Sequence, residues 1–112
     1  GHHPIFADTD KSDAERLDME KRVDTILRKH KNVSMYLCGH IHNFQHIRKP
    51  GSSIDYVVNS SGSLSRKVKA VDGTQFCSSE SGFSLVSADK KELCLHMINK
   101  DGKVIYTVRQ TK

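Results

Sequence analysis

A single segment of this chain has the spacing of a helix, while every other regular segment is short and typical of a strand. Over residues 13–30, apolar residues recur at helical intervals among charged ones. Ser12 and Glu15 form a capping box at the start of this segment. Basic residues crowd its last turn, where the helix dipole favours cations. The pattern predicts one helix with an apolar stripe made of Leu17, Met19, Val23, Ile26 and Leu27.

The remaining regular segments are rich in β-branched, aromatic and aliphatic residues and are separated by turn residues. The last three are joined by two short polar turns, which predicts an antiparallel meander over 82–112. Residues 63–81 have weak periodicity and many Ser, Lys and Gly, so we expect a long surface loop there. One helix followed by strands predicts an α+β fold. The expected strands are 33–38, 44–47, 54–59, 83–88, 92–98 and 103–111.

The length and charge of the chain limit the classes of function. At 112 residues it fits a single domain, 1–112. No apolar run reaches 18 residues, so we expect no membrane-spanning helix. The net charge is +5, and the densest basic cluster (Arg66, Lys67 and Lys69) has no interleaved aromatic residue, so we expect a solvated loop and no nucleic-acid partner.

The three cysteines do not have the spacing of a zinc ribbon or of a disulfide framework. Cys38, Cys77 and Cys94 lie far apart and include no CxxC pair. One pair is compatible with a disulfide in an oxidising compartment, and the pattern leaves open which pair that would be.

Seven histidines are many for this length. Five of them gather in two loops (His2, His3, His40, His42 and His46), and the other two, His30 and His96, lie on predicted regular elements. His40 and His42 follow Gly39 at the end of a predicted strand, so two imidazoles project from one loop. His2 and His3 form a second pair near the start of the chain. Because His is the commonest metal ligand in proteins, these loops are candidates for a metal site. The alternative is that the two pairs are unrelated surface histidines.

Two short motifs, taken together, resemble the metal motifs of purple acid phosphatases, a branch of the calcineurin-like dinuclear metallophosphoesterases. They are GHHP at residues 1–4 and YLCGHIHN at residues 36–43. The resemblance implies the C-terminal portion of a four-layer α/β/β/α sandwich with one main helix and a mainly antiparallel sheet. It divides the chain into 1–62 with the metal-motif loops, 63–81 as a loop and 82–112 as the meander.

The resemblance also implies a set of ligands. His2 and His40 would bind one metal and His42 the other, with iron beside zinc, manganese or a second iron. His3 and Asn43 would lie beside the metals or the substrate. Two neighbouring cations hold a phosphate, activate water and stabilise the leaving oxygen. The family's other ligands are not found in this chain, so we expect an incomplete centre. Residues 8–11 also lack the substrate-contacting His of many relatives, and Ile41 replaces a common Asp.

The function that this resemblance implies is hydrolysis of phosphate monoesters by a larger parent protein, with this chain as a C-terminal fragment that is inactive alone. Its partners would be a phosphate ester and the missing N-terminal half, without nucleic acid or membrane. Relatives are usually exported, which implies export here. Two alternatives stay open: a dinuclear phosphodiesterase or nucleotidase fragment, and a non-catalytic binding module.

Overall fold

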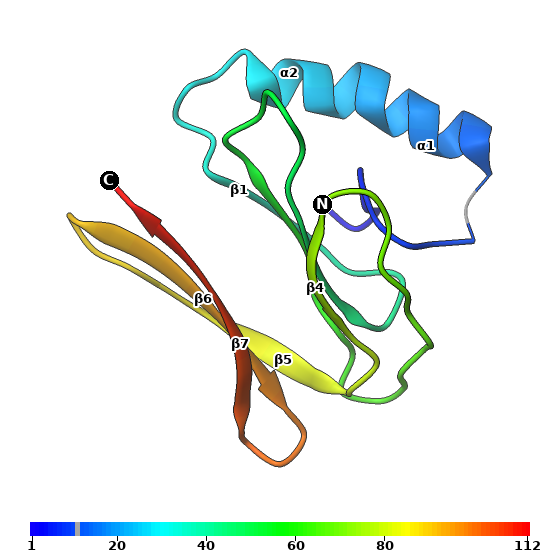
Figure 1. The fold of residues 1–112 in the computed structure, drawn as a ribbon, viewed down its shortest axis with the longest axis vertical. Coiled ribbons are helices and arrows are strands. Elements are labelled where there is room, and N and C mark those ends of the chain that lie inside the picture. The colour runs from blue at the N-terminus through cyan, green and yellow to red at the C-terminus, as the bar shows by residue number, and fades with distance from the viewer. Residues whose placement is uncertain (11) are drawn as a thin grey trace.

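The computed structural model describes residues 1–10 and 12–112. Lys11, part of the predicted 8–11 loop, lies outside the described residues. Figure 1 shows one helical segment lying above a four-stranded sheet, with a three-stranded sheet on the other side. Within the described part of the chain, this arrangement confirms the α+β class with one main helix and mainly antiparallel sheets.

The helical segment runs continuously through α1 (Asp13–Met19), the π-helical turn η1 (Glu20–Asp24) and α2 (Thr25–Arg28). Ser12 Oγ accepts a hydrogen bond from the Glu15 backbone N–H at 3.3 Å, so the predicted helix start is confirmed. A π-helical turn contains one extra residue and was not expected from the apolar spacing.

Buried hydrogen bonds attach the end of the π-helical turn to the sheet. Asp24 is 5% exposed, and its Oδ1 accepts from the Tyr56 hydroxyl at 2.5 Å. Its Oδ2 accepts from Arg28 Nε at 2.6 Å, one turn along the helix. Burial, and then the hydrogen bond to Asp24, raises the pKa of Tyr56. The helix is therefore fixed to the sheet by a charged group as well as by apolar contacts.

The four-stranded sheet has the strand order β1-β3-β2-β4. β1 pairs in parallel with β3, and the β2/β3 and β2/β4 pairs are antiparallel. The expected strand 44–47 is confirmed with the same bounds, and 33–38 and 54–59 are confirmed with slightly shorter ones. The four strands are β1 (Met35–Cys38), β2 (Phe44–Ile47), β3 (Asp55–Val58) and β4 (Thr74–Ser78).

The prediction that 63–81 is entirely loop was wrong, because β4 lies within it. Two contacts from distant parts of the chain hold this strand. Phe76 stacks on Tyr106 with ring centroids 4.3 Å apart. Gly73 has φ +91°, and a Cβ there would come within 2.2 Å of the Arg48 carbonyl oxygen, which makes glycine necessary at this close approach. Neither contact leaves a periodic signal in the sequence.

The three-stranded sheet is the predicted antiparallel meander, β5 (Gly82–Ala88), β6 (Glu92–Asn99) and β7 (Val104–Thr111). Gly102 has φ +79° in the turn before β7, as a tight turn requires. The outer face of this sheet exposes Phe83, Leu85 and Val104, each about half accessible.

The two faces of the four-stranded sheet carry separate apolar clusters, because neighbouring residues on a strand point to opposite sides. On β3, Tyr56 faces the helix and Val57 faces the three-stranded sheet. The layers are therefore helix, sheet and sheet. The cluster between the sheets contains Phe44, Val57, Leu95, Met97 and Val108, and the one beneath the helix contains Ile5, Ile47, Ile54 and Tyr56.

Candidate metal site and the loops that build it

The loop between β1 and β2 holds two of its histidines in a strained backbone conformation. His40 has φ +73° and His42 has φ +58°, the only non-glycine residues with positive φ among the described residues. This left-handed region costs free energy for any residue with a Cβ, and such strain is concentrated at functional sites. Between them, Ile41 is buried, 4% exposed, in a cluster with Cys38 and Val58. The loop is thus fixed by the buried Ile41, while His40 is exposed and His42 is half-buried.

The first residues of the chain lie against this loop through backbone hydrogen bonds. The Gly39 N–H donates to the His2 carbonyl at 3.1 Å. The Tyr36 hydroxyl donates to the His3 carbonyl at 2.8 Å. Both bonds fix main-chain atoms and leave the imidazoles of the two histidines free to face the β1–β2 loop.

Three imidazoles meet where the two loops touch. One ring nitrogen from each of His2, His3 and His40 lies within 4.8 Å of the others, and we call these residues the histidine cluster. His2 Nε2 lies 3.0 Å from His40 Nδ1. The ring centroids of His3 and His40 are 4.3 Å apart. The predicted ligands His2 and His40 are therefore brought together, and His3, predicted to lie beside the metal, contributes a third nitrogen.

The donor set of the histidine cluster fits a borderline transition metal ion such as zinc. His3 Nδ1 is buried, and no hydrogen-bond partner for it is found in the part of the chain that the structure describes. Glu15 Oε1 lies 3.6 Å from it. A buried ring nitrogen without a partner is costly, and coordination would satisfy it. Three neutral imidazoles leave a fourth tetrahedral position for water or another ligand.

His42, the predicted ligand of a second metal, does not belong to the histidine cluster. Its Nδ1 is also buried, and no hydrogen-bond partner for it is found among the described residues. Its ligand role stays a prediction, because no second group of metal-ligating side chains surrounds it in the part of the chain that the structure describes.

Asn43 is part of a hydrogen-bonded support for the nearby residues 8–10, and its place beside the metals or the substrate stays a prediction. It is 2% exposed, and its Oδ1 accepts from Gln45 Nε2 at 2.8 Å. The same Gln45 side chain accepts from the Asp8 N–H at 2.7 Å and donates to the Asp8 carbonyl at 3.0 Å. Asn43 and Gln45 therefore hold the backbone at Asp8 in place.

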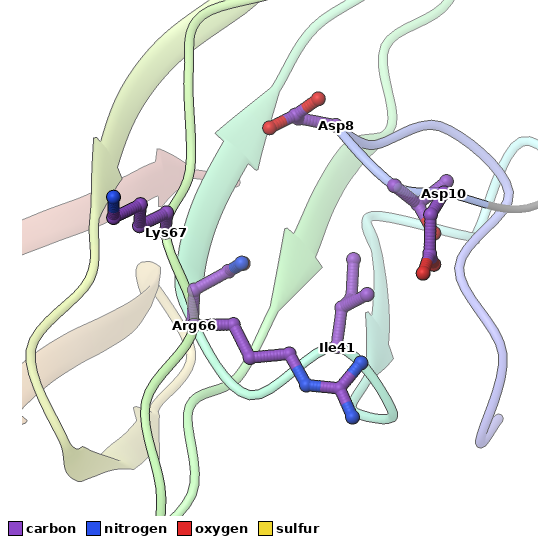
Figure 2. Close-up of a pocket in the computed structure, with 7 residues that line it drawn as sticks. Asp8, Asp10, Ile41, Arg66 and Lys67 are labelled. Carbon is purple, nitrogen blue, oxygen red and sulfur yellow. The ribbon is translucent and has the colours of Figure 1, made fainter.

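Next to this support lies a hollow of about 300 Å³, drawn in Figure 2. Acidic residues from the N-terminal loop and basic residues from the loop before β4 line it. Its lining residues are Asp8, Thr9, Asp10, Ile41, Asn43, Arg66 and Lys67. No motif in the sequence predicted that these two loops meet.

A third group that sequence reasoning missed is a polar network centred on two buried residues, His46 and Asp55. Its other members are Tyr106, Arg48 and Gln110. His46 Nε2 lies 2.6 Å from Asp55 Oδ1, and His46 Nδ1 lies 2.9 Å from the Tyr106 hydroxyl. Arg48 Nε donates to the same Asp55 oxygen at 2.6 Å, and Gln110 Nε2 donates to the other one.

The hydrogen bonds of this network decide the charge of Asp55. Burial alone would raise the pKa of this carboxyl group. The hydrogen bonds from His46, Arg48 and Gln110 outweigh burial and lower its pKa to about 2. Asp55 is therefore a buried carboxylate whose partners all come from neighbouring strands or their ends. The one signal in the sequence that could have found this network is the presence of a polar residue, His46 or Asp55, on each of two otherwise mostly apolar strands.

The fold of this chain is similar to that of a solved structure, whereas its sequence matches no known family. No protein-family model matches the chain, and no curated protein matches it. A solved structure that is similar is described as GAP50, the anchor in the inner membrane complex of Plasmodium. It superposes with a TM-score of 0.83 at 22% identity, over 99% of this chain and 35% of that chain. The chain thus spans about a third of the length of its structural neighbour.

This neighbour corrects the family prediction drawn from the two motifs. The prediction of a purple acid phosphatase was wrong, because the similar structure is described as an anchor protein and no family model supports the assignment. Physically, GHHP and GHIHN are short loop motifs, and a loop geometry can be shared without the reaction. None of the described helices is long and apolar enough to cross a membrane. At 22% identity the likeness establishes a common fold, and the chain belongs to that fold.

Proposed function

We propose that this chain is a non-catalytic binding module in which one transition metal ion ties the N-terminal loop to the β1–β2 loop. The observation that carries the proposal is the convergence of three imidazole nitrogens, from His2, His3 and His40, within 4.8 Å. The two histidine pairs belong to loops that are far apart in the sequence. An ion bound to both would therefore act as a cross-link between them.

The donor set favours binding over hydrolysis. Two-metal hydrolysis needs two cations about 3.5–4 Å apart, with ligands for each. The histidine cluster offers the ligands of one ion, and His42 stands outside it. Phosphoester hydrolysis by a larger protein, of which this chain would be one part, is the competing function. A role in holding partners together is also in keeping with the description of the structural neighbour as an anchor.

The test is a calorimetric titration of the apo protein with Zn²⁺, followed by urea unfolding at fixed free zinc. We expect one ion per chain and a gain in stability of about 2.7 kcal/mol at a free concentration of 100 Kd. His40→Gln should abolish both effects. His30→Gln, at the exposed end of the helical segment and outside the histidine cluster, is the matched control and should leave them unchanged.

A second measurement separates binding from catalysis. p-Nitrophenyl phosphate and bis(p-nitrophenyl) phosphate are incubated with the zinc-loaded and the manganese-loaded protein. We expect no turnover above that of the free metal ion. Turnover that disappears in His40→Gln would replace the binding module by a hydrolase. Failure of zinc to bind would end the metal proposal outright.

A further inference from the structure

The hollow beside the β1–β2 loop has opposite charges on facing walls. We propose that it binds a small zwitterion, with the carboxylate of the ligand at Arg66 and Asn43 and its ammonium group at Asp8 and Asp10. The hollow of about 300 Å³ is at the lower end of the size range of small-molecule sites. None of these four residues belongs to the histidine cluster, so this proposal and the metal proposal can fail separately.

The Asp8 part of the acidic wall is held in place before any ligand binds. The Asp8 backbone is fixed on both its N–H and its carbonyl by the Gln45 side chain, which is fully buried. Asp8 Oδ2 accepts from the Lys69 N–H at 2.9 Å, which leaves Oδ1 of the same carboxylate for a ligand. A site whose groups are already ordered loses less entropy when a ligand binds.

The basic wall is held to the same loop. The Arg66 N–H donates to the His42 carbonyl at 2.9 Å. The strained residue His42 therefore also anchors the loop before β4. Figure 2 shows the Arg66 side chain reaching across the hollow towards Ile41, on the side where Asp10 lies. The Lys67 side chain points the other way. Arg66 is therefore the cation that a ligand would meet.

The floor supplies an oriented hydrogen-bond donor. Asn43 is 2% exposed and lines the hollow. Because its Oδ1 accepts from Gln45, its Nδ2 is the end left for a ligand, and no partner for that nitrogen is found among the described residues. A donor that already points in one direction loses little freedom when it bonds an acceptor such as a carboxylate oxygen.

The combination selects a zwitterion over a simple ion. A phosphate dianion would pair with Arg66 but would be repelled by Asp8 and Asp10. A simple amine would pair with the two carboxylates but would face the guanidinium. A ligand with a carboxylate at one end and an ammonium group at the other satisfies both walls. Arg66 can donate two parallel hydrogen bonds to that carboxylate.

The test is an NMR titration of backbone amides with the series from glycine and β-alanine to 6-aminohexanoate, which varies only the separation of the two charges. We expect one length to bind best, with shifts at residues 8–10, 41–43 and 66. Hexanoate and hexylamine, each with one charge removed, should bind at least tenfold more weakly than the best member. Binding of inorganic phosphate tighter than every zwitterion would overturn the proposal.

Variants assign the two ends of the ligand. Arg66→Gln should weaken the binding of the best zwitterion about tenfold, so that it binds no more tightly than the amine. Asp10→Asn should weaken it likewise and abolish its advantage over the carboxylic acid. Lys67→Gln removes the same charge as Arg66→Gln from the same loop and should leave affinity within twofold. Equal losses in the two loop variants, or no binding by any member at 10 mM, would refute the site.

Discussion

Two regions a few residues apart use histidine in opposite ways. His46 lies in β2, is 2% exposed, and both its ring nitrogens have partners, Asp55 and Tyr106. His42 lies in the loop just before that strand, has a positive φ, and its buried Nδ1 has no partner among the described residues. The fold therefore supplies hydrogen-bond partners for both ring nitrogens of His46, whereas no described residue supplies one for Nδ1 of His42.

A histidine with a role beyond the stability of the fold can be recognised from this contrast. A buried polar group that is fully hydrogen-bonded favours one arrangement of the core, and its removal lowers the stability of the fold. A positive φ costs stability, and so does a buried ring nitrogen without a partner, so either feature needs another reason. By this criterion His46 is structural, whereas His3 and His42 are candidates for ligand binding.

The strongest test of the comparison is to break the His46 network at its carboxylate. Asp55→Asn replaces the carboxylate that accepts hydrogen bonds from His46, Arg48 and Gln110 by a neutral amide. We therefore expect the free energy of unfolding to fall by about 3 kcal/mol. Asp72→Asn is the matched control, because the Asp72 side chain is exposed and its carboxylate pairs with Lys49 at 3.2 Å. It should cost less than about 1 kcal/mol. Urea unfolding at pH 7 measures both, and equal losses would contradict the structural role.

The network also predicts a pH dependence with a definite sign. The pKa of Asp55 is lowered to about 2, so its contribution to stability is complete above the ordinary value of 3.8 and is lost as the pH falls towards 2. The amount is about 2 kcal/mol. The stability difference between the wild type and Asp55→Asn should therefore shrink between pH 4 and pH 2 in urea unfolding. A difference that stays constant over this range would show that the carboxyl group titrates normally.

The smallest expected effect concerns the strained loop. In the presence of a chelator, His42→Gly should be more stable than His42→Ala by about 1 kcal/mol, because glycine accepts φ +58° and alanine does not. The same pair of variants at His96, on β6 with an ordinary φ, should show the opposite order by about 0.5–1 kcal/mol. Thermal unfolding checks both orders. The same order at both positions would mean that the loop is not strained.

Elements whose apolar residues repeat locally could be predicted from the sequence. The helical segment and the meander over 82–112 lie where they were expected, because their periodicity and their turn residues act within a few positions. The π-helical turn and β4 could not be predicted. At the end of the π-helical turn, Asp24 accepts a hydrogen bond from Tyr56, which is 32 positions away in the sequence. In β4, Phe76 stacks on Tyr106, which is 30 positions away.

The candidate site was predictable only in part, for the same reason. The motifs singled out His2 and His40, and the structure brings them together. The third nitrogen of the cluster comes from His3, and its position depends on the hydrogen bond from Tyr36 to its carbonyl. The hollow depends on the contact of Asp8 with Lys69, 61 positions away, which no spacing rule predicts.

The π-helical turn has a consequence for how this chain can tolerate insertions and deletions. Each residue of an α-helix turns the direction of the side chains by about 100°. In the π-helical turn each residue turns it by less, so the wider turn takes up the extra residue. Removing one residue within Glu20–Asp24 would therefore restore an ordinary helix and leave Met19 and Leu27 facing the sheet together nearly as before. A deletion elsewhere in the helical segment would instead rotate everything after it by about 100°. Homologous sequences that lack the extra residue should therefore keep the same apolar positions on both sides of the gap.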